Sequence, residues 1–309
     1  MQTPTVRLQD PDGSRSNATI GLLFAAISAT SLGVVTTFAR LAYDNGATPF
    51  AFITWRYVVG LMAALTIAGV LKRSLKVPRA ALMPVAAVTL AMAMISIGYL
   101  SSVHFIPVGL AALLFYTYPI LVLAITTVIA RELPGPYRIA AFVLAFAGLA
   151  LALGPSLEGL DWRGVSYALI ASLGAAILFV MTPRATQHIS VYTLTIWAFV
   201  GGLVLSLIVL PWLGDYAMPH ANLGWTGFSL AISLYIFGQL TNFAALRHAE
   251  PARAALIYNL EPLIAIIAAA VVLDETMLPL QYAGGGLVIG ALIIAARRQA
   301  GTGSTSPRE

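Results

Sequence analysis

The sequence contains no cysteine and very little charge. The absence of cysteine excludes disulfide bonds, thiolate metal sites and cysteine nucleophiles. Charged residues make up 9% of the 309 residues, whereas soluble domains contain about 25%. Hydrophobic residues make up 59%, and the mean hydropathy is +0.88. This composition is that of an integral membrane protein.

The sequence also lacks the motifs of several enzyme classes. It has no GxxxxGK[ST] motif for ATP and no HExxH motif or acidic cluster for a metal, so neither a cofactor nor a metal is expected. An intramembrane enzyme would need a nucleophile and a base at matched depth, which we do not find. A receptor would more naturally carry a sizeable soluble domain, for which the short connections leave no room. The basic residues lie in these connections, where they indicate topology rather than binding to nucleic acid.

Apolar runs predict ten membrane helices, since about 20 such residues cross a bilayer. The first run is too long for the apolar part of a cleaved signal peptide, so we expect it to be retained. Residues 1–18 are predicted to be a disordered cytoplasmic tail, and residues 298–309 a cytoplasmic tail. The predicted spans are residues 20–40, 49–71, 81–103, 108–130, 137–154, 164–182, 191–213, 223–246, 252–273 and 280–296.

Lysine and arginine are distributed unequally between the two sets of connections. If the N-terminus is inside, the outer connections contain only Arg40 and Arg163, and Arg56 lies within a span. The remaining basic residues lie on the inner side. Cytoplasmic loops are enriched in Lys and Arg, so both termini are predicted to be cytoplasmic.

The two halves of the chain resemble each other. Pro119 and Pro262 are separated by 262−119=143 residues, and Glu132 and Glu275 by 275−132=143. We therefore predict repeats at residues 19–154 and 155–297. Five spans per half give the repeats opposite orientations, an arrangement that places a binding site between the halves near the midplane. The predicted fold is an all-α integral membrane protein, with ten transmembrane helices as two inverted five-helix repeats around a central cavity.

Glu261 is the one acidic residue within a predicted span. A carboxylate at this depth is costly unless it is paired, hydrated or protonated. Its functional interpretation is a proton-coupling or cation-binding group, and the alternative is a hydrogen-bonded glutamate that fixes a kink. Pro262 follows it, and this proline and Pro119 are expected to kink their helices.

Polar side chains recur on one face of two predicted helices. Tyr235, Gln239 and Asn242 are spaced i, i+4 and i+7, so they share a face. Subtracting 143 gives a matching face, made of Met92, Ser96 and Tyr99. Such groups either bond between helices or line a wet cavity. The repetition favours cavity walls.

Aromatic residues cluster around the paired prolines. Phe115 and Tyr118 lie in the first half, and Tyr258 lies beside Asn259 in the second. These residues are candidates for an aromatic cavity wall, although ordinary helix packing explains many of them equally well. Arg56 could contact a substrate carboxylate, but we favour a structural role in which it reaches the interface or ties helices together.

Several segments resemble a known family. The chain is similar to the EamA-type ten-helix carriers of the drug/metabolite transporter superfamily, through Ala39-Arg40 and Arg56, PVGLAALLFYTYPILV with Arg131-Glu132, and ALRHAEPARAALIYNLEPLIAIIAA with Asp274-Glu275. The resemblance implies a secondary carrier of the bacterial inner membrane that exports amino acids, other metabolites or toxic cations. The bacterial aromatic amino acid exporters are one similar branch. The chain departs from the family pattern in SATSLGVV, which lacks a tryptophan before Gly33, and this puts Ser31 among the candidate cavity residues.

Two functions follow from these observations. The first is export of neutral or aromatic amino acids by alternating access, with protons as candidate coupling ions. The second is efflux of lipophilic cations, with Glu261 as the counter-charge. A nucleotide-sugar carrier is disfavoured because Arg56 is the one basic residue within the predicted spans that could meet phosphates. The expected partners are a small-molecule substrate and the lipid bilayer, with no nucleic acid and no obligate protein partner.

Overall fold

The computed structural model describes residues 11–102, 105–106, 108–154, 160–212, 214–273 and 278–301. These residues form helices and connecting turns, without strands. In chain order the helices are α1 Pro11–Tyr43, α2 Pro49–Val70, α3 Arg79–Ser102, α4 Val108–Phe115, α5 Tyr118–Ala130, α6 Pro136–Leu153, α7 Trp162–Thr186, α8 Val191–Val209, the 3-10 turn η1 Leu210–Trp212, α9 Asn222–His248, α10 Pro251–Ile257, α11 Leu260–Val272 and α12 Pro279–Gly301.

The membrane helices agree with the predicted spans. Within the described chain, nine helical segments are long and apolar enough to cross a bilayer, with α4–α5 and α10–α11 each forming one of them. A shorter apolar helix, Pro279–Ile294, forms most of α12 and corresponds to the tenth predicted span. The prediction of an all-α membrane protein with ten membrane helices is confirmed.

The ends of the chain differ from the prediction. α1 begins at Pro11 and α12 continues to Gly301, so residues 11–18 and 298–301, predicted as parts of the two tails, are helical here. A helix can continue past its apolar span because its hydrogen bonds are internal, and a proline is tolerated in the first turn. Residues 1–10 and 302–309 lie outside the described residues, as do Asp274-Glu275 and His104.

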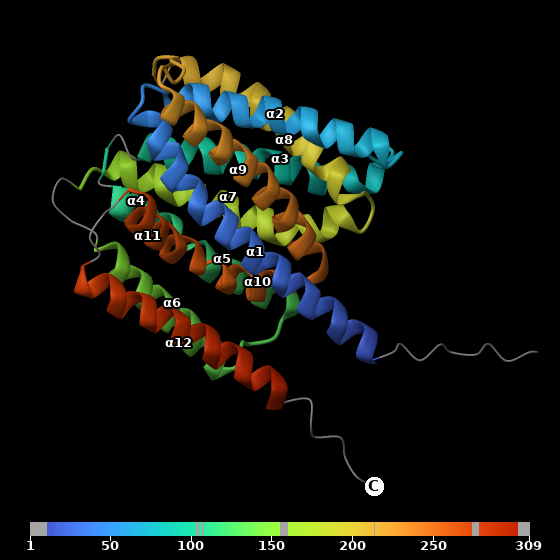
Figure 1. Cartoon of the computed structure of the whole chain (residues 1–309). Coiled ribbons are helices and arrows are strands. Elements are labelled where there is room, and N and C mark those ends of the chain that lie inside the picture. Colours follow the sequence, from blue (N-terminus) through green and yellow to red (C-terminus); the bar gives the residue numbers. More distant parts are fainter. Residues whose placement is uncertain are drawn as a thin grey trace, which may run out of the picture.

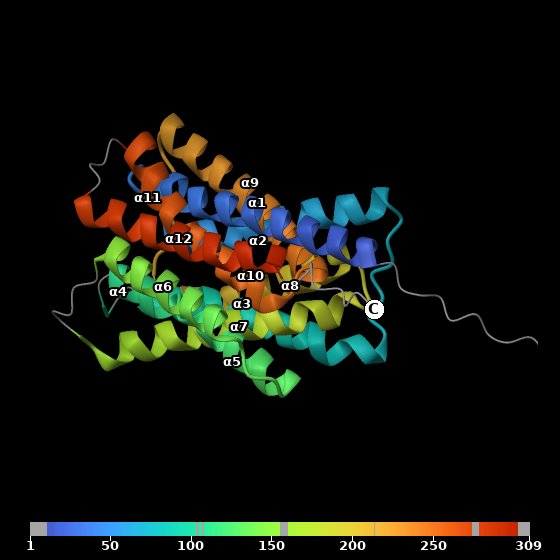
Figure 2. The same cartoon turned by 90° about the horizontal axis from the view of Figure 1, so that it is seen from below.

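The two halves interleave with the symmetry of an inverted repeat. α1 packs along α9 and α11, and the corresponding helix of the second half, α7, packs along α3 and α5. α2 pairs with α8 along one side of the bundle, and α6 pairs with α12 along the other (Figures 1 and 2). Gly148 and Gly284 make the α6–α12 approach possible, because a Cβ on either would meet the backbone of the partner helix.

One membrane helix in each half is interrupted near its middle. α4 ends at Phe115 and α10 ends at Ile257, one residue before Tyr258. Pro119 and Pro262 lack the amide hydrogen that would bond to the carbonyl groups of Phe115 and Tyr258, so the helix breaks one turn before each proline. The predicted kinks are confirmed, and the two breaks face the centre of the molecule.

Each break is closed by a polar side chain that turns back on its own helix. The Thr117 hydroxyl donates to the Leu114 carbonyl at 2.7 Å. The Asn259 amide nitrogen donates to the Leu256 carbonyl at 2.9 Å. The same two carbonyls also accept the backbone N–H groups of Thr117 and Asn259, so each side chain adds a second donor at its break. Backbone polar groups in the membrane must find partners within the protein.

Candidate functional site: a central cavity

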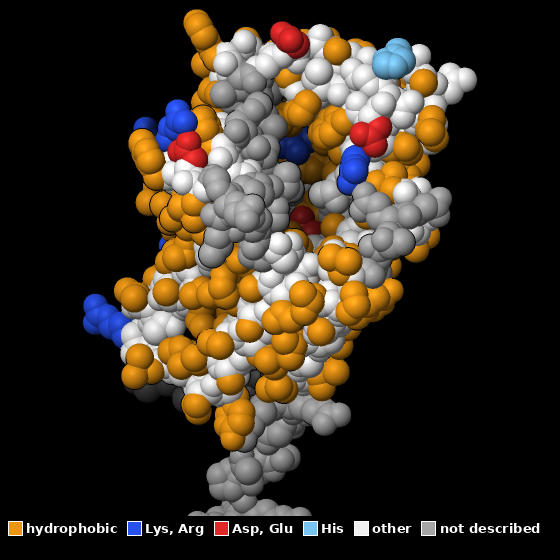
Figure 3. All heavy atoms as spheres, turned by 90° about the vertical axis from the view of Figure 1, so that its left-hand side faces the viewer, with side chains coloured by type: hydrophobic (Ala, Val, Ile, Leu, Met, Phe, Trp, Pro, Cys, Tyr) orange, Lys and Arg blue, Asp and Glu red, His pale blue; other side chains and the backbone are white. Residues whose placement is uncertain are grey.

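A cavity of about 510 Å³ lies between the two halves. It reaches Tyr43 at the end of α1 and Pro49 at the start of α2, so it extends to the side of the bundle where the basic residues are sparse. The space-filling view from this side shows a hollow with one basic and one acidic side chain at depth (Figure 3). Arg56 and Glu261 are the charged residues among those that line the cavity.

The cavity contains most of the residues that the sequence predicted for it. Ten of the twelve candidates line it, from α3, from both broken helices and from α9: Met92, Ser96, Tyr99, Phe115, Tyr118, Tyr235, Gln239, Asn242, Tyr258 and Glu261.

Two candidates do not line the cavity. Ser31 packs against Gly238 of α9, and its hydroxyl donates to the Ile27 carbonyl at 2.9 Å. Asn259 is 2% exposed, and its amide closes the break in its own helix. The first lies in a helix–helix contact and the second caps a free carbonyl, so neither faces the cavity.

Sequence reasoning missed the contributions of α1 and α7. Val35 and Thr36 of α1 line the cavity, as do Leu178 and Phe179 of α7. These pairs are separated by 178−35=143 and 179−36=143 residues, the same offset that relates the prolines. The repeat offset could have indicated these residues, but most of them are apolar, and apolar residues are not distinguished from ordinary helix packing by the sequence. Tyr43 and Tyr116 also line the cavity.

The amides of α9 are incompletely satisfied. The Gln239 amide nitrogen donates to the Met92 thioether sulfur at 3.3 Å, which is a weak acceptor. Asn242 is 4% exposed, and its side-chain oxygen has no hydrogen-bond partner among the described residues. Buried polar groups usually have partners, so this wall retains capacity for a bound ligand or water.

Arg56 is held in the cavity by groups on two other helices. Its guanidinium donates to the Ser96 hydroxyl at 2.8 Å and lies 4.4 Å from the centre of the Tyr235 ring. The Ser96 and Tyr57 hydroxyl oxygens are 2.7 Å apart. Arg56 therefore connects α2 to α3 and α9 through contacts with their side chains. This agrees with the predicted role of tying helices together, but Arg56 also forms part of the cavity wall. Its Nε atom is buried without a hydrogen-bond partner.

Glu261 lies in the first turn of α11, where backbone amides favour a negative charge. Tyr116 from the other broken helix lies beside its carboxylate. Tyr99, Tyr118 and Tyr258 lie within electrostatic range of the same carboxylate. Four tyrosines contributed by both halves therefore surround this one acid.

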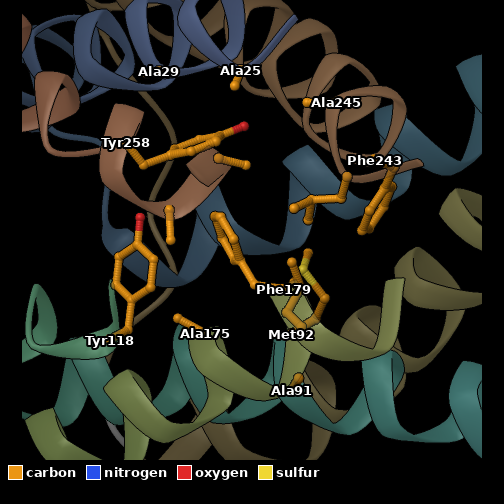
Figure 4. Close-up of a cluster of buried hydrophobic side chains, with 14 of the residues drawn as sticks. Ala25, Ala29, Ala91, Met92, Tyr118, Ala175, Phe179, Phe243, Ala245 and Tyr258 are labelled. Atoms are coloured by element: carbon orange, nitrogen blue, oxygen red, sulfur yellow. The ribbon is translucent and has the colours of Figure 1, made fainter. Parts of the chain in front are cut away.

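Aromatic contacts connect the two breaks. The ring centres of Tyr118 and Phe179 are 5.1 Å apart, and those of Phe179 and Tyr258 are 5.2 Å apart. Figure 4 shows these three rings projecting toward one another from different helices. This packing fixes the aromatic wall beside Glu261, because edge and tilted ring contacts add specific geometry to apolar burial.

Comparison with known proteins places this architecture in a family. The model of the EamA-like transporter family matches residues 19–154 and again residues 162–297. The chain belongs to the EamA-like transporter family. Membership in this family establishes a multi-pass membrane transporter.

Relatives in the EamA-like family come from archaea and bacteria. An uncharacterized transporter of Archaeoglobus fulgidus is 24% identical over 87% of this chain and 98% of its own length. The threonine/homoserine exporter RhtA of Escherichia coli is 28% identical, and the match covers 63% of this chain and 63% of RhtA. The chain thus matches less than two thirds of that exporter's length.

The EamA-like fold of this chain also has a counterpart among solved structures. A crystal structure superposes with a TM-score of 0.77 at 15% identity, and the match covers 92% of this chain and 98% of the other. At this identity the similarity establishes the fold alone.

Proposed function

We propose that this protein is a secondary carrier that exports small metabolites, foremost neutral or aromatic amino acids, by alternating access. The observation that carries the proposal is the cavity between the inverted halves, which combines aromatic walls with one arginine and one glutamate. Midplane sites between inverted repeats are where secondary carriers bind their substrates. The cavity volume of about 510 Å³ lies within the range of small-molecule sites.

The export direction is supported by a relative and by topology. RhtA is named a threonine/homoserine exporter, and both of these amino acids are neutral. From the distribution of basic residues we infer that both termini lie on the cytoplasmic side of an inner membrane. In that orientation the cavity opens outward, which is the state that releases an exported substrate.

Glu261 is the candidate coupling group. It is the one acid lining the cavity, and it lies at a break where Tyr116 from the opposite half contacts it. A proton exchanged at this carboxylate would change the charge between two halves that move against each other. Coupling through such buried carboxylates is typical of membrane transporters.

A second candidate function is efflux of lipophilic cations. Glu261 among four tyrosines offers both a counter-charge and ring faces to a cation. Arg56 in the same cavity opposes this function, because it repels a second positive charge.

Counterflow in proteoliposomes tests the proposal. Vesicles loaded with unlabelled amino acid should accumulate the labelled form from outside, for a panel that includes threonine, phenylalanine and tyrosine. Running the panel at two internal pH values with wild type and Glu261→Gln separates proton-coupled from facilitated transport. Absence of counterflow for every amino acid, together with accumulation of a lipophilic cation, would replace the first function by the second.

A further inference from the structure

We propose that Arg56 and Glu261 together recognise one α-amino acid as a zwitterion, with its carboxylate on Arg56 and its ammonium group on Glu261. The inference rests on the proposed function and names the two groups that define its substrate class. Arg56 and Glu261 carry opposite charges and line the same cavity without pairing with each other. The described residues contain no ion pair between Arg56 and Glu261.

The partners of the two charged groups form separate sets. Arg56 contacts Ser96, Tyr57 and Tyr235. Glu261 interacts with a different group, which consists of Tyr99, Tyr116, Tyr118 and Tyr258. None of these partners carries a formal charge at neutral pH. Each charge is therefore oriented and solvated by neutral groups, and each remains available to an ion of opposite sign.

The Arg56 end is suited to a carboxylate. A guanidinium presents donors in a planar fork that matches two carboxylate oxygens, and stacking on Tyr235 holds that plane in place. One nitrogen donates to Ser96, whereas Nε is buried and has no hydrogen-bond partner among the described residues. A donor of this kind in a cavity wall indicates a ligand acceptor.

The Glu261 end is suited to an ammonium group. The carboxylate supplies the negative charge, and the surrounding tyrosine rings and hydroxyls supply further attraction for a primary amine. A primary ammonium has three donors, so it can contact the carboxylate and hydroxyl oxygens at the same time.

The two ends belong to one face of α3. Ser96, which holds Arg56, and Tyr99, which lies near Glu261, are three residues apart on that helix, and both line the cavity. The carboxylate and amino groups of an α-amino acid are attached to a single carbon atom, so the proposal requires both charged groups to reach one molecule in this cavity.

The remaining wall would then receive the side chain. Gln239 and Asn242 continue along α9 from Tyr235, and α7 contributes Phe179 to the lining. This surface offers amides and an aromatic ring without further charge, which suits a neutral side chain. Charged analogues that lack one of the two backbone groups would leave Arg56 or Glu261 desolvated and unpaired, so they should bind less well.

The test compares matched ligands that differ in one charged group. The competitors of amino acid counterflow are L-phenylalanine, 2-phenylethylamine and 3-phenylpropionate, and in parallel L-threonine, 1-amino-2-propanol and 3-hydroxybutyrate. For wild type, the better amino acid should inhibit at a concentration at least tenfold lower than its amine or its acid, because each charged hydrogen bond contributes about one to two powers of ten in affinity. An amine or acid that inhibits as strongly as the amino acid overturns the proposal without any variant.

Variants then assign each charge to its residue. Arg56→Gln should reduce the preference for the amino acid over the amine to within about threefold, while the preference over the acid remains. Glu261→Gln should reduce the preference for the amino acid over the acid, while the preference over the amine remains. Arg56→Lys should retain part of the preference over the amine, because lysine keeps the positive charge but lacks the planar guanidinium. Arg163→Gln, an exposed arginine outside the cavity, is the control and should leave both ratios unchanged.

The outcomes separate this inference from the proposed function. Counterflow that persists while Arg56→Gln weakens amino acid, amine and acid alike would mean that Arg56 only supports the fold, so the inference fails and the function stands. The absence of counterflow for every amino acid with wild type would overturn both. The ratios of inhibitory concentrations are measured within one protein preparation. Partial misfolding of a variant lowers the amount of active protein equally for all three ligands, so it does not change these ratios and does not imitate the predicted result.

Discussion

In the first half the membrane helix is interrupted at Tyr116 and Thr117, and in the second half at Tyr258 and Asn259. Both breaks precede a proline, and both are closed by a side chain that bonds to the carbonyl three residues earlier. At the repeat offset of 143 residues, Pro262 corresponds to Pro119, and Glu261 takes the position that Tyr118 has at the first break (261−118=143).

This comparison separates what the repeat conserves from what it varies. The shared backbone provides two matching interruptions that meet at the cavity, as alternating access requires. The charge is present at one break only, and Tyr116 of the uncharged break lies beside the charged one. Symmetry therefore explains the architecture, whereas the difference between the breaks accounts for the chemistry.

The largest expected effect on transport comes from displacing the break of the second half, which carries Glu261. A Cβ on Gly33 of α1 would meet the Glu261 carbonyl and the Ile264 side chain. Gly33→Leu should lower transport at least tenfold and reduce stability by about 1–3 kcal/mol, because an overpacked contact forces the helices apart. Transport and thermal unfolding measure both effects.

Gly69→Leu is the matched control, since the space around Gly69 is open within 4 Å. Equal loss of transport in both variants would mean that leucine disturbs the bundle at any position. The contact between Gly33 and the second break would then have no specific role in transport.

A smaller change tests the contact between the two breaks. Tyr116→Phe removes the hydroxyl beside Glu261 and should raise the KM for amino acid counterflow about tenfold, since a hydroxyl that interacts with a charged group contributes about 1.5–3 kcal/mol. Tyr118→Phe is the control, because Tyr118 acts on Glu261 only through longer-range electrostatics. If the two variants have the same KM, the Tyr116 hydroxyl has no special role in substrate binding.

The two caps offer a direct comparison of the breaks. Thr117→Ala and Asn259→Ala should each reduce stability by about 1 kcal/mol, because each leaves a carbonyl without its side-chain donor. Asn259→Ala should in addition alter the pH dependence of transport, since Glu261 follows two residues later. A change of pH dependence in Thr117→Ala of the same size would contradict the functional difference between the breaks.

The smallest effect is expected at the basic side of the bundle. Glu250 pairs with Arg138 of the first half and with Arg253, so it connects the halves opposite the cavity opening. These groups are partly exposed, and Glu250→Gln should therefore change stability by less than about 1 kcal/mol, with the effect lost at high salt. A transport rate that changes several-fold at low salt only would indicate that the pair holds this side closed.

Asp161→Asn provides the control for that variant. The hydrogen bonds from Arg163 hold the pKa of Asp161 below its usual range, so this pair is also charged at neutral pH, but it lies within one half. Its loss should not change the salt dependence of transport.

The sequence was sufficient to predict which helix faces line the cavity where polar residues recur at helical spacing. Tyr235, Gln239 and Asn242 could be placed together because periodicity and the repeat offset agree. Ser31 became a candidate because its segment departs from the family pattern, but such a departure does not reveal which neighbour the side chain meets, and Ser31 packs against Gly238 of α9. Asn259 was misplaced because the backbone break creates a local acceptor for its amide, which no spacing rule indicates.

Arg56 illustrates a different limit. A sequence places an arginine within a span but does not show whether its side chain reaches the interface or turns inward. Here Ser96 and Tyr235, from two helices distant in the chain, hold it in the cavity. Such a position depends on three helices meeting, so it becomes visible only in the folded structure.

The most direct test of the account is whether the cavity is the substrate site. The chain has no cysteine, so Thr36→Cys introduces a single thiol on an exposed part of the cavity wall, and Asp215→Cys places one in a connection outside it. We predict that a membrane-impermeant thiol reagent added from outside labels both, and that saturating amino acid substrate slows labelling of the first and not of the second. Labelling at position 36 that is unaffected by saturating substrate would contradict the assignment of the cavity.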